Sequence, residues 1–284
     1  MDKVCIIVLN YNNGLKTVSA LKSILGQSVD NHSVAVVDNC STDDSIEIIS
    51  SYFAANDLNF SIIQNESYQS RNNAHFPRFA IIQAEKNGGY SYGNNIGIRY
   101  ARSLNIFSHL LIINNDVILP SDFLECMLSK YHDLQISSND KKIAMGATEL
   151  SPDGILNHHG FHYLHIPTSI TFFKPVWPCF KYIVGSCIFL DIDAPLMDES
   201  FFLYFDDIQY SKILLRQGYL LFSNENSAYI HEVGGSESSD LNKLLFEGMR
   251  MFYSMNYRYL LPFIMFERSI LNYWLKIKKY FHGL

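Results

Sequence analysis

Two aspartates, Asp206 and Asp207, stand side by side directly after the apolar stretch FFLYF at residues 201–205. One of them could cap the helix that the following residues, IQYSKILLRQ, are expected to form before Gly218. A cap needs only one carboxylate, so capping does not explain the second. The pair is therefore a candidate for catalysis.

A second set of polar residues follows the strands expected in the first half of the chain. Strands are expected at 4–11, 33–39, 79–85 and 109–114, and their ends carry Asn10-Tyr11-Asn12, Asp38-Asn39, Lys86-Asn87-Gly88-Gly89 and Asn114-Asn115-Asp116. Any one of these groups could be an ordinary turn. Because parallel sheets bind ligands at the carboxyl ends of their strands, four such groups in succession indicate one binding site.

The turn after the first strand reads LNYNNG and lacks the G-x-G-x-x-G pattern of dinucleotide-binding domains. The chain also lacks the lysine motif of a P-loop. A diphosphate ligand would then be held by a carboxylate with a divalent metal. Asp116, at the end of a hydrophobic strand, is the candidate ligand of that metal.

The elements that must position these residues alternate along the chain. Helical spacing of apolar residues at 15–26, 44–54 and 91–104 separates the four strands, which predicts a Rossmann-like, mostly parallel sheet with helices on both faces. After Leu119 the order is mixed, with a helix from Ser121, strands near 142–150, 183–190, 219–223 and 227–231, and the helix after Asp207. The polar segment 64–77 reads as a loop. We expect one α/β domain over 1–236 and a helical section over 237–284.

Composition excludes several classes of protein. The 284 residues are 48% hydrophobic, which is typical of a globular chain, and a net charge of -6 argues against nucleic-acid binding. The five cysteines are scattered without a CxxC, and the apolar run at 4–11 is too short for an export signal, so a cytoplasmic protein is expected. The apolar run at 259–266 is too short to span a membrane.

Six motifs together resemble the family 2 glycosyltransferases of the GT-A fold, nearest to the rhamnosyltransferase-like and galactofuranosyltransferase-like branch. In order they are VLNYNN, VVDNCSTDDS, EKNGGYSYGNNIGI, LLIINNDV, FFLYFDDIQYS and HEVGGS, and they cover about residues 3–236. The resemblance implies an inverting hexosyltransferase of bacterial cell-surface polysaccharide biosynthesis. Its donor would be dTDP-rhamnose or a UDP-sugar, and its acceptor a hydroxyl of a glycan or lipid-linked glycan.

The resemblance also implies roles for individual residues. Asp207 matches the catalytic base, while Asp206 would contact the acceptor or cap the helix. Asp116 and His231 match ligands of Mg²⁺ or Mn²⁺, but Asn114 stands where the family's D-x-D motif has its first carboxylate, so the metal would be held more weakly. Nucleotide-sugar binding falls on Asn10, Tyr11, Asn12, Asp38, Lys86, Asn87, Asn94, Asn114, Asn115, Gly185 and Ser186.

The C-terminal section combines helical spacing with basic and aromatic residues. Residues 251–284 hold five Lys or Arg and one Glu, and the aromatic residues among them include Tyr253, Tyr257, Tyr259, Trp274 and Tyr280. This pattern fits a helix lying on the anionic inner face of the cell membrane. It fits equally a helix packed on the catalytic domain or in a homodimer.

Two other functions stay open at this point. A nucleotidyltransferase would carry a Gly-rich loop with Arg and Lys after its first strand, and VLNYNNGLK has only Lys16. A sugar-binding or scaffold subunit that has lost its metal site is favoured by the amide at Asn114.

Overall fold

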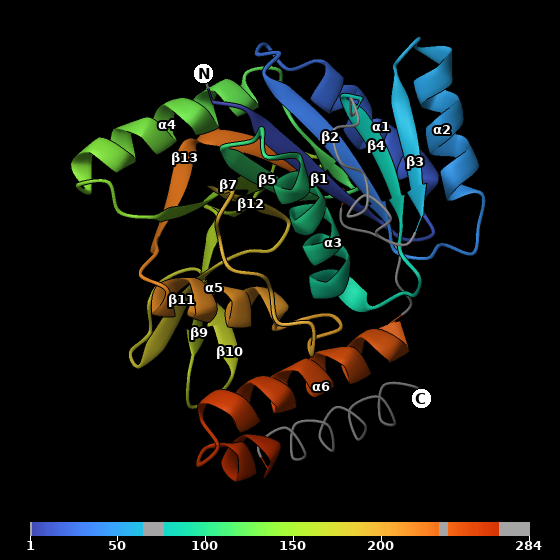
Figure 1. The fold of residues 1–284 in the computed structure, drawn as a ribbon. Coiled ribbons are helices and arrows are strands. Elements are labelled where there is room, and N and C mark those ends of the chain that lie inside the picture. Colours follow the sequence, from blue (N-terminus) through green and yellow to red (C-terminus); the bar gives the residue numbers. More distant parts are fainter. Residues whose placement is uncertain (1, 65–76, 233–237, 267–284) are drawn as a thin grey trace.

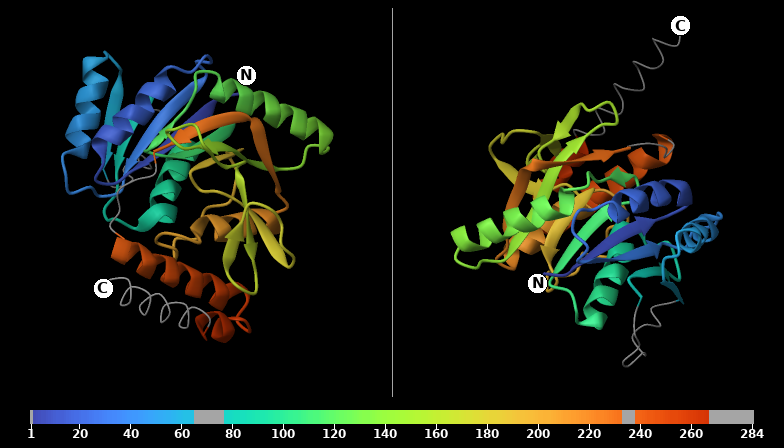
Figure 2. Two further views of the ribbon diagram at one scale, coloured as in Figure 1. Left: turned by 180° about the vertical axis from the view of Figure 1, so that it is seen from behind. Right: turned by 90° about the horizontal axis from the view of Figure 1, so that it is seen from above.

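One large mixed sheet forms the centre of the molecule in the computed structural model, which describes residues 2–64, 77–232 and 238–266 (Figure 1, Figure 2). The strand order is β3-β4-β2-β1-β5-β12-β7-β13-β6, and β8 pairs with β7. These strands are β1 (Val4–Asn10), β2 (His32–Asp38), β3 (Phe60–Gln64), β4 (Phe79–Gln83), β5 (His109–Asn114), β6 (Val117–Ile118), β7 (Ile143–Leu150), β8 (Leu156–His158), β12 (Cys187–Asp191) and β13 (Leu220–His231).

The first half of the chain forms a parallel sheet, as expected. All pairings among β1 to β5 are parallel, and Val4 lies opposite both His32 and His109. Alternate residues of β1 face opposite sides of the sheet. Ile6 lies in the cluster that includes α1 (Gly14–Leu25), α2 (Ser45–Ala55) and α4 (Phe123–Ser137). Ile7 lies in the cluster that includes α3 (Gly89–Leu104) and α5 (Asp206–Arg216). Helices thus cover both faces, which confirms the α/β prediction. Strand β3 was not expected, and the segment 65–76 lies outside the described residues.

The second half of the sheet is mixed. Strand β12 runs antiparallel to both β5 and β7, while β13 runs parallel to β7. The short strands expected at 219–223 and 227–231 are one strand, β13, whose register shifts between Asn224 and Ala228. At its end β13 pairs antiparallel with β6, and His231 lies opposite Val117. This pairing brings His231 beside Asp116.

A small second sheet was missed in the sequence. Its order is β10-β9-β11, with β9 (Phe161–His165), β10 (Ile170–Phe172) and β11 (Cys179–Ile183). The strand expected at 183–190 is therefore two strands, β11 and β12, separated at Gly185 and Ser186. One face of the small sheet packs on α5 and α6 (Ser238–Asn256), through a cluster that includes Leu164, Phe205 and Phe252.

The C-terminal section packs on the rest of the chain through α6. Tyr253 is fully buried, and Tyr257 packs against the same cluster, so these two aromatic side chains stabilise the fold instead of facing a membrane. Tyr259 is 78% exposed. Trp274 and Tyr280 lie outside the described residues. None of the described helices has the length and hydropathy needed to cross a membrane.

Candidate active site

The aspartate pair occupies the first turn of α5, and neither residue caps the helix. The cap position is Phe205, which has a φ of 61°, and Tyr204 before it has a φ of 65°. Bulky residues adopt this left-handed conformation only at a cost in free energy, and such strain concentrates at functional sites. Neither aspartate is at the N-cap position, although Asp207 accepts the first-turn N–H of Ile208. Both carboxyl groups project from the first turn of the helix.

Two neighbouring helices hold the strained segment. The Tyr90 N–H of α3 donates to the Phe202 carbonyl at 2.7 Å. A Cβ atom on Gly89 would lie 2.1 Å from that carbonyl oxygen, and one on Gly248 of α6 would lie 2.4 Å from the carbonyl oxygen of Tyr204. Only glycine permits these approaches, so α3 and α6 together fix the main chain ahead of the aspartates.

The two carboxyl groups lie in different surroundings. Asp206 is 7% exposed, whereas Asp207 is only partly buried and accepts hydrogen bonds from the N–H groups of Gly185 at 3.3 Å and Ile208 at 2.8 Å. Burial raises the pKa of both groups, and the adjacent Asp207 carboxylate raises the pKa of Asp206 further. A carboxylate with a raised pKa is suited to general-base work near neutral pH.

A cavity of about 320 Å³ opens at the pair, and its wall brings together several of the predicted site residues. Asp206 and Asp207 line one side, and Asn114, Gly185, Ser186 and His231 also line it. Strand β5 supplies Asn114, the β11–β12 turn supplies Gly185 and Ser186, and the end of β13 supplies His231. The predicted base and the predicted metal ligand thus reach one cavity.

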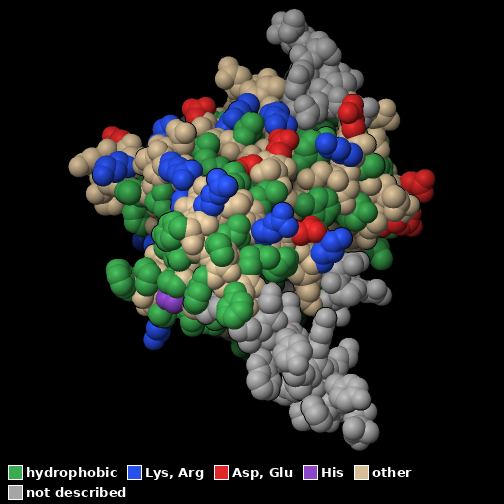
Figure 3. Space-filling view, turned by 90° about the horizontal axis from the view of Figure 1, so that it is seen from below, with side chains coloured by type: hydrophobic (Ala, Val, Ile, Leu, Met, Phe, Trp, Pro, Cys, Tyr) green, Lys and Arg blue, Asp and Glu red, His purple; other side chains and the backbone are tan. Residues whose placement is uncertain are grey.

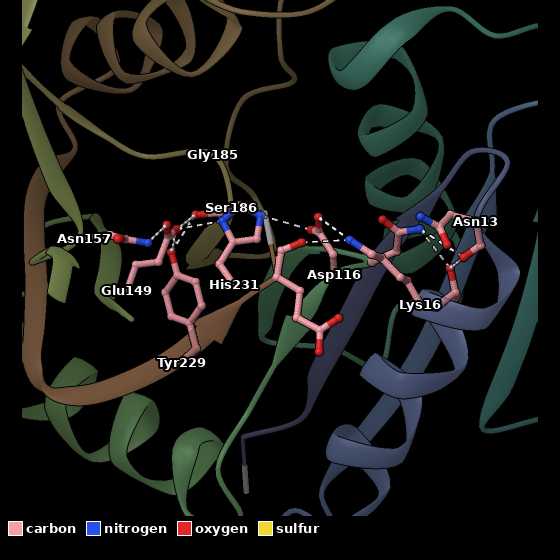
Figure 4. Close-up of polar contacts among 12 residues, drawn as sticks. Asn13, Lys16, Asp116, Glu149, Asn157, Gly185, Ser186, Tyr229 and His231 are labelled. Carbon is pink, nitrogen blue, oxygen red and sulfur yellow. Dashed lines mark hydrogen bonds and ion pairs between the residues drawn. The ribbon is translucent and has the colours of Figure 1, made fainter. Parts of the chain in front are cut away.

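Beside this cavity, the side chains of Lys16 and His231 both contact the Asp116 carboxylate (Figure 4). His231 Nε2 lies 3.0 Å from Asp116 Oδ1, and Lys16 Nζ lies 3.8 Å from Asp116 Oδ2. Lys16 also donates to the Glu232 carbonyl at 2.8 Å. Burial alone would lower the pKa of His231, but its contacts with Asp116 and Glu149 outweigh burial and raise this pKa to about 9.

Asp116 and His231 fit a divalent cation, because a carboxylate oxygen and an imidazole nitrogen converge on one point at the edge of the sheet. No group of three or more His, Cys, Asp or Glu suited to a metal occurs among the described residues. A cation here would need further ligands from the bound substrate or water. The amide nitrogen of the neighbouring Asn115 donates towards Asn10, Asn13 and Thr17.

Most of the predicted nucleotide-binding residues at the first two strand ends form hydrogen bonds within and between the two turns. Asn10 is fully buried and donates to Asp38 at 2.7 Å, and Asp38 also accepts from the N–H and hydroxyl of Ser41. Asn12 exchanges hydrogen bonds with Thr42. These contacts tie the turns after β1 and β2 together, so Asn10, Asn12 and Asp38 shape the edge of the sheet.

A second cavity, of about 340 Å³, lies at these turns. Tyr11, which is 45% exposed, and Asn87 line it. Tyr90 and Leu203 line this cavity and the one at the aspartates, so the two cavities are neighbours.

Seven predicted residues line neither cavity: Asn10, Asn12, Asp38, Asn115 and Asp116 lie at the edge of the sheet as described above, and Lys86 and Asn94 are the other two. Lys86 is exposed, and its Nζ lies 5.3 Å from the centre of the Tyr92 ring. Asn94 is fully buried within α3 and donates to the Tyr90 carbonyl at 3.1 Å. The structure therefore gives Lys86 and Asn94 no direct place in the site.

Other residues of the site were missed. Lys16 lies in the first turns of the helix after the first strand, a position that could have indicated it. Tyr90 stands between the two cavities, and its hydroxyl donates to the Gly185 carbonyl. The α6 residues Leu241, Leu244 and Leu245 also line the cavities, and no local signal in the sequence connects them to the site.

Comparisons with known proteins agree with this geometry. The family model described as Glycosyl transferase family 2 matches residues 5–139. Among solved structures, S. aureus TarS in complex with UDP-GlcNAc is 16% identical with a TM-score of 0.53, and the match covers 89% of this chain and 66% of that one. Mannosyltransferase PcManGT from Pyrobaculum calidifontis, in complex with GDP-Man and Mn²⁺, is 13% identical with a TM-score of 0.59, covering 90% of this chain and 64% of that one.

The chain is shorter than these structural relatives. It spans only 44% of a longer TarS structure, with 15% identity and a TM-score of 0.51. No curated protein matches the sequence significantly. At these identities the solved structures show the fold alone, and the family match is confined to residues 5–139.

Proposed function

This chain carries a family 2 glycosyltransferase segment on a GT-A fold, and from that premise we propose that it moves a sugar from a nucleotide-diphosphate sugar to an acceptor hydroxyl with inversion. The observation that carries the proposal is the shared cavity of Asp207 and His231, with Asp116 in contact with His231. The proposed base and the proposed diphosphate site would then both reach one cavity.

Asp207 is the base of the proposed reaction. As the acceptor oxygen forms its bond to the anomeric carbon, the hydroxyl proton passes to the Asp207 carboxylate, and the bond from that carbon to the diphosphate oxygen breaks. The Gly185 and Ile208 N–H groups hold the Asp207 carboxylate in place. Its raised pKa gives it an affinity for the proton that an exposed aspartate lacks. Asp206 supports the turn and lies close enough to the cavity to contact the acceptor.

The leaving diphosphate belongs at the other end of the cavity. Asp116 and His231 would hold Mg²⁺ or Mn²⁺ there, and the bound cation would neutralise charge on the diphosphate. Lys16, beside Asp116, adds a positive charge from the protein itself. Because Asn114 replaces a carboxylate, this lysine compensates in part for a weakly held cation. Tyr11 and Asn87, in the neighbouring cavity, would contact the nucleoside.

For the donor we propose a UDP-sugar or dTDP-rhamnose, and for the acceptor a glycan or lipid-linked glycan of a bacterial cell-surface polysaccharide. The UDP-GlcNAc and GDP-Man complexes of the two relatives support a nucleotide-sugar donor in general. The reaction would take place in the cytoplasm, with 1–236 as the catalytic segment.

The section 237–284 would then contact the inner face of the cell membrane or a second copy of the chain. In this section α6 exposes Met251, Met255 and Arg250, and Arg258, just after α6, is exposed as well. Lys and Arg side chains lie among hydrophobic ones on the face of the molecule seen from below (Figure 3). Such a mixture is compatible with an anionic membrane surface.

Donor binding tests this proposal. The melting temperature of the full-length protein would be measured with UDP-GlcNAc, other UDP-sugars, GDP-mannose and dTDP-rhamnose, each with Mn²⁺. We expect one donor class to raise it, because a ligand that binds only the native state stabilises it. Tyr11→Ala should weaken that rise, and exposed Lys86→Ala is the matched control that should not. No rise with any donor would contradict the proposal.

A further inference from the structure

A buried carboxylate lies directly behind the proposed metal site. Glu149 of β7 is 5% exposed, and two strands and a turn bring its neighbours to it (Figure 4). Its Oε2 accepts hydrogen bonds from Ser186 at 2.7 Å and Tyr229 at 2.9 Å, and its Oε1 accepts one from Asn157 at 3.1 Å. These partners come from the β11–β12 turn, β13 and β8.

Two imidazole rings complete the surroundings of Glu149. Nδ1 of His231 and Nε2 of His158 lie 3.0 and 3.1 Å from Oε2, in orientations that make these contacts ion pairs rather than aligned hydrogen bonds. Nδ1 of His158 accepts the Gly160 N–H, so the ring proton of His158 sits on Nε2, towards Glu149. Burial would raise the pKa of Glu149, but the two histidines outweigh it and hold this pKa well below its usual range.

A buried charge with so many donors is costly to assemble, and replacing such a group by apolar residues is often neutral or stabilising for a fold. Stability alone therefore does not explain Glu149. Its position does offer an explanation, because it contacts one ring nitrogen of His231 while Asp116 contacts the other. Histidines that bind metals usually give their second ring N–H to a carboxylate, which fixes the tautomer and the orientation of the ring.

We propose that Glu149 is a positioning residue of the cation site: its negative charge, 3.0 Å from Nδ1, favours the His231 tautomer that carries the proton on Nδ1 and leaves Nε2 for a cation at the point where Asp116 converges. The inference rests on the proposed function, in which His231 is a metal ligand. Through Ser186 the same carboxylate also fixes the turn whose Gly185 N–H binds the base. One buried group thus links the cation end and the base end of the cavity.

Mn²⁺ binding to the full-length protein tests the inference without an activity assay. Free Mn²⁺ would be titrated by electron paramagnetic resonance, with the metal alone and again with UDP or GDP. Glu149→Gln keeps the size of the side chain and should bind Mn²⁺ about 10–100-fold more weakly, as for other lost partners of a metal-binding histidine. The control Tyr229→Phe removes a hydrogen bond to the same oxygen without touching His231, and its affinity should stay within about threefold of wild type.

The variant His231→Ala separates the positioning role of Glu149 from the existence of the metal site. If it loses Mn²⁺ binding while Glu149→Gln binds as wild type, the positioning role is overturned and the metal site stands. If wild type binds no Mn²⁺, or His231→Ala binds as well as wild type, both are overturned. Should Glu149→Gln fail to fold, Glu149→Asp retains the charge but withdraws it from His231, and it should also weaken Mn²⁺ binding; an unchanged affinity would refute the role.

Discussion

Replacing Asp206 with asparagine should stabilise the protein at neutral pH. Asp206 is buried, and its neighbour on the first turn of α5 is a second carboxylate. Both features raise its pKa. Asparagine has nearly the same shape and keeps one acceptor oxygen for the backbone N–H groups, and it carries no charge to desolvate.

The magnitude follows from the pKa difference between native and unfolded chain. Each unit by which the native pKa exceeds the unfolded value corresponds to about 1.4 kcal/mol. Burial and the adjacent carboxylate raise the pKa of Asp206 to about 8, so at neutral pH this side chain costs the native state on the order of a few kcal/mol. An unfolded aspartate ionises near pH 4, whereas the native side chain keeps its proton to higher pH. Between these values the native state binds more protons, so wild-type stability falls as pH rises. The advantage of Asp206→Asn should therefore be absent below about pH 4 and grow above it.

Thermal unfolding by circular dichroism between pH 4.5 and 8 measures this effect. At pH 7.5 we expect the melting temperature of Asp206→Asn to exceed that of wild type by about 5 °C or more, from roughly 2 °C per kcal/mol. Asp44→Asn is the matched control: Asp44 is an exposed aspartate at the start of α2 without a side-chain cap, and its loss should change little. A less stable Asp206→Asn, or a difference that does not depend on pH, would refute the reasoning.

Three further outcomes are expected. Asp207→Asn should lower the initial transfer rate by about 10²–10⁴ while leaving donor affinity unchanged, as for a lost general base; a rate near wild type would exclude Asp207 as the base. Chelation should abolish transfer and Mg²⁺ or Mn²⁺ restore it, and Asp116→Ala should be more damaging than Asn114→Ala; full activity in excess EDTA would argue against the metal. Flotation at low salt should recover the full-length protein with anionic liposomes and not with neutral ones; no recovery would favour packing or dimer contacts of the C-terminal section.

The parallel half of the sheet could be predicted because its signals are local. Continuous β-branched runs such as SVAVVDN, separated by helical spacing, specify strand and helix without reference to the rest of the chain. The polar strand ends followed from that prediction, and so did the place of Asp116 at the edge of the sheet.

The remaining features depend on contacts between distant segments. His231 meets Asp116 only because β13 continues through an irregularity at Asn224 and pairs with β6, and the sequence has no local sign of that pairing. The strands of the small sheet are short, and their stability comes from packing on α5 and α6 rather than from propensity. The surroundings of Glu149 also depend on distant segments, because its partners come from β8, β13 and the β11–β12 turn.

The most direct test of the central claim is the product released from a nucleotide sugar. Purified full-length protein with Mn²⁺ would be incubated with UDP-sugars, GDP-mannose and dTDP-rhamnose, with and without a glycan acceptor, and the nucleotide products separated by chromatography. Our account predicts release of nucleoside diphosphate from one donor class, strongly slowed in Asp207→Asn. Release of pyrophosphate would instead indicate a nucleotidyltransferase, and no turnover of any donor would indicate a sugar-binding or scaffold protein.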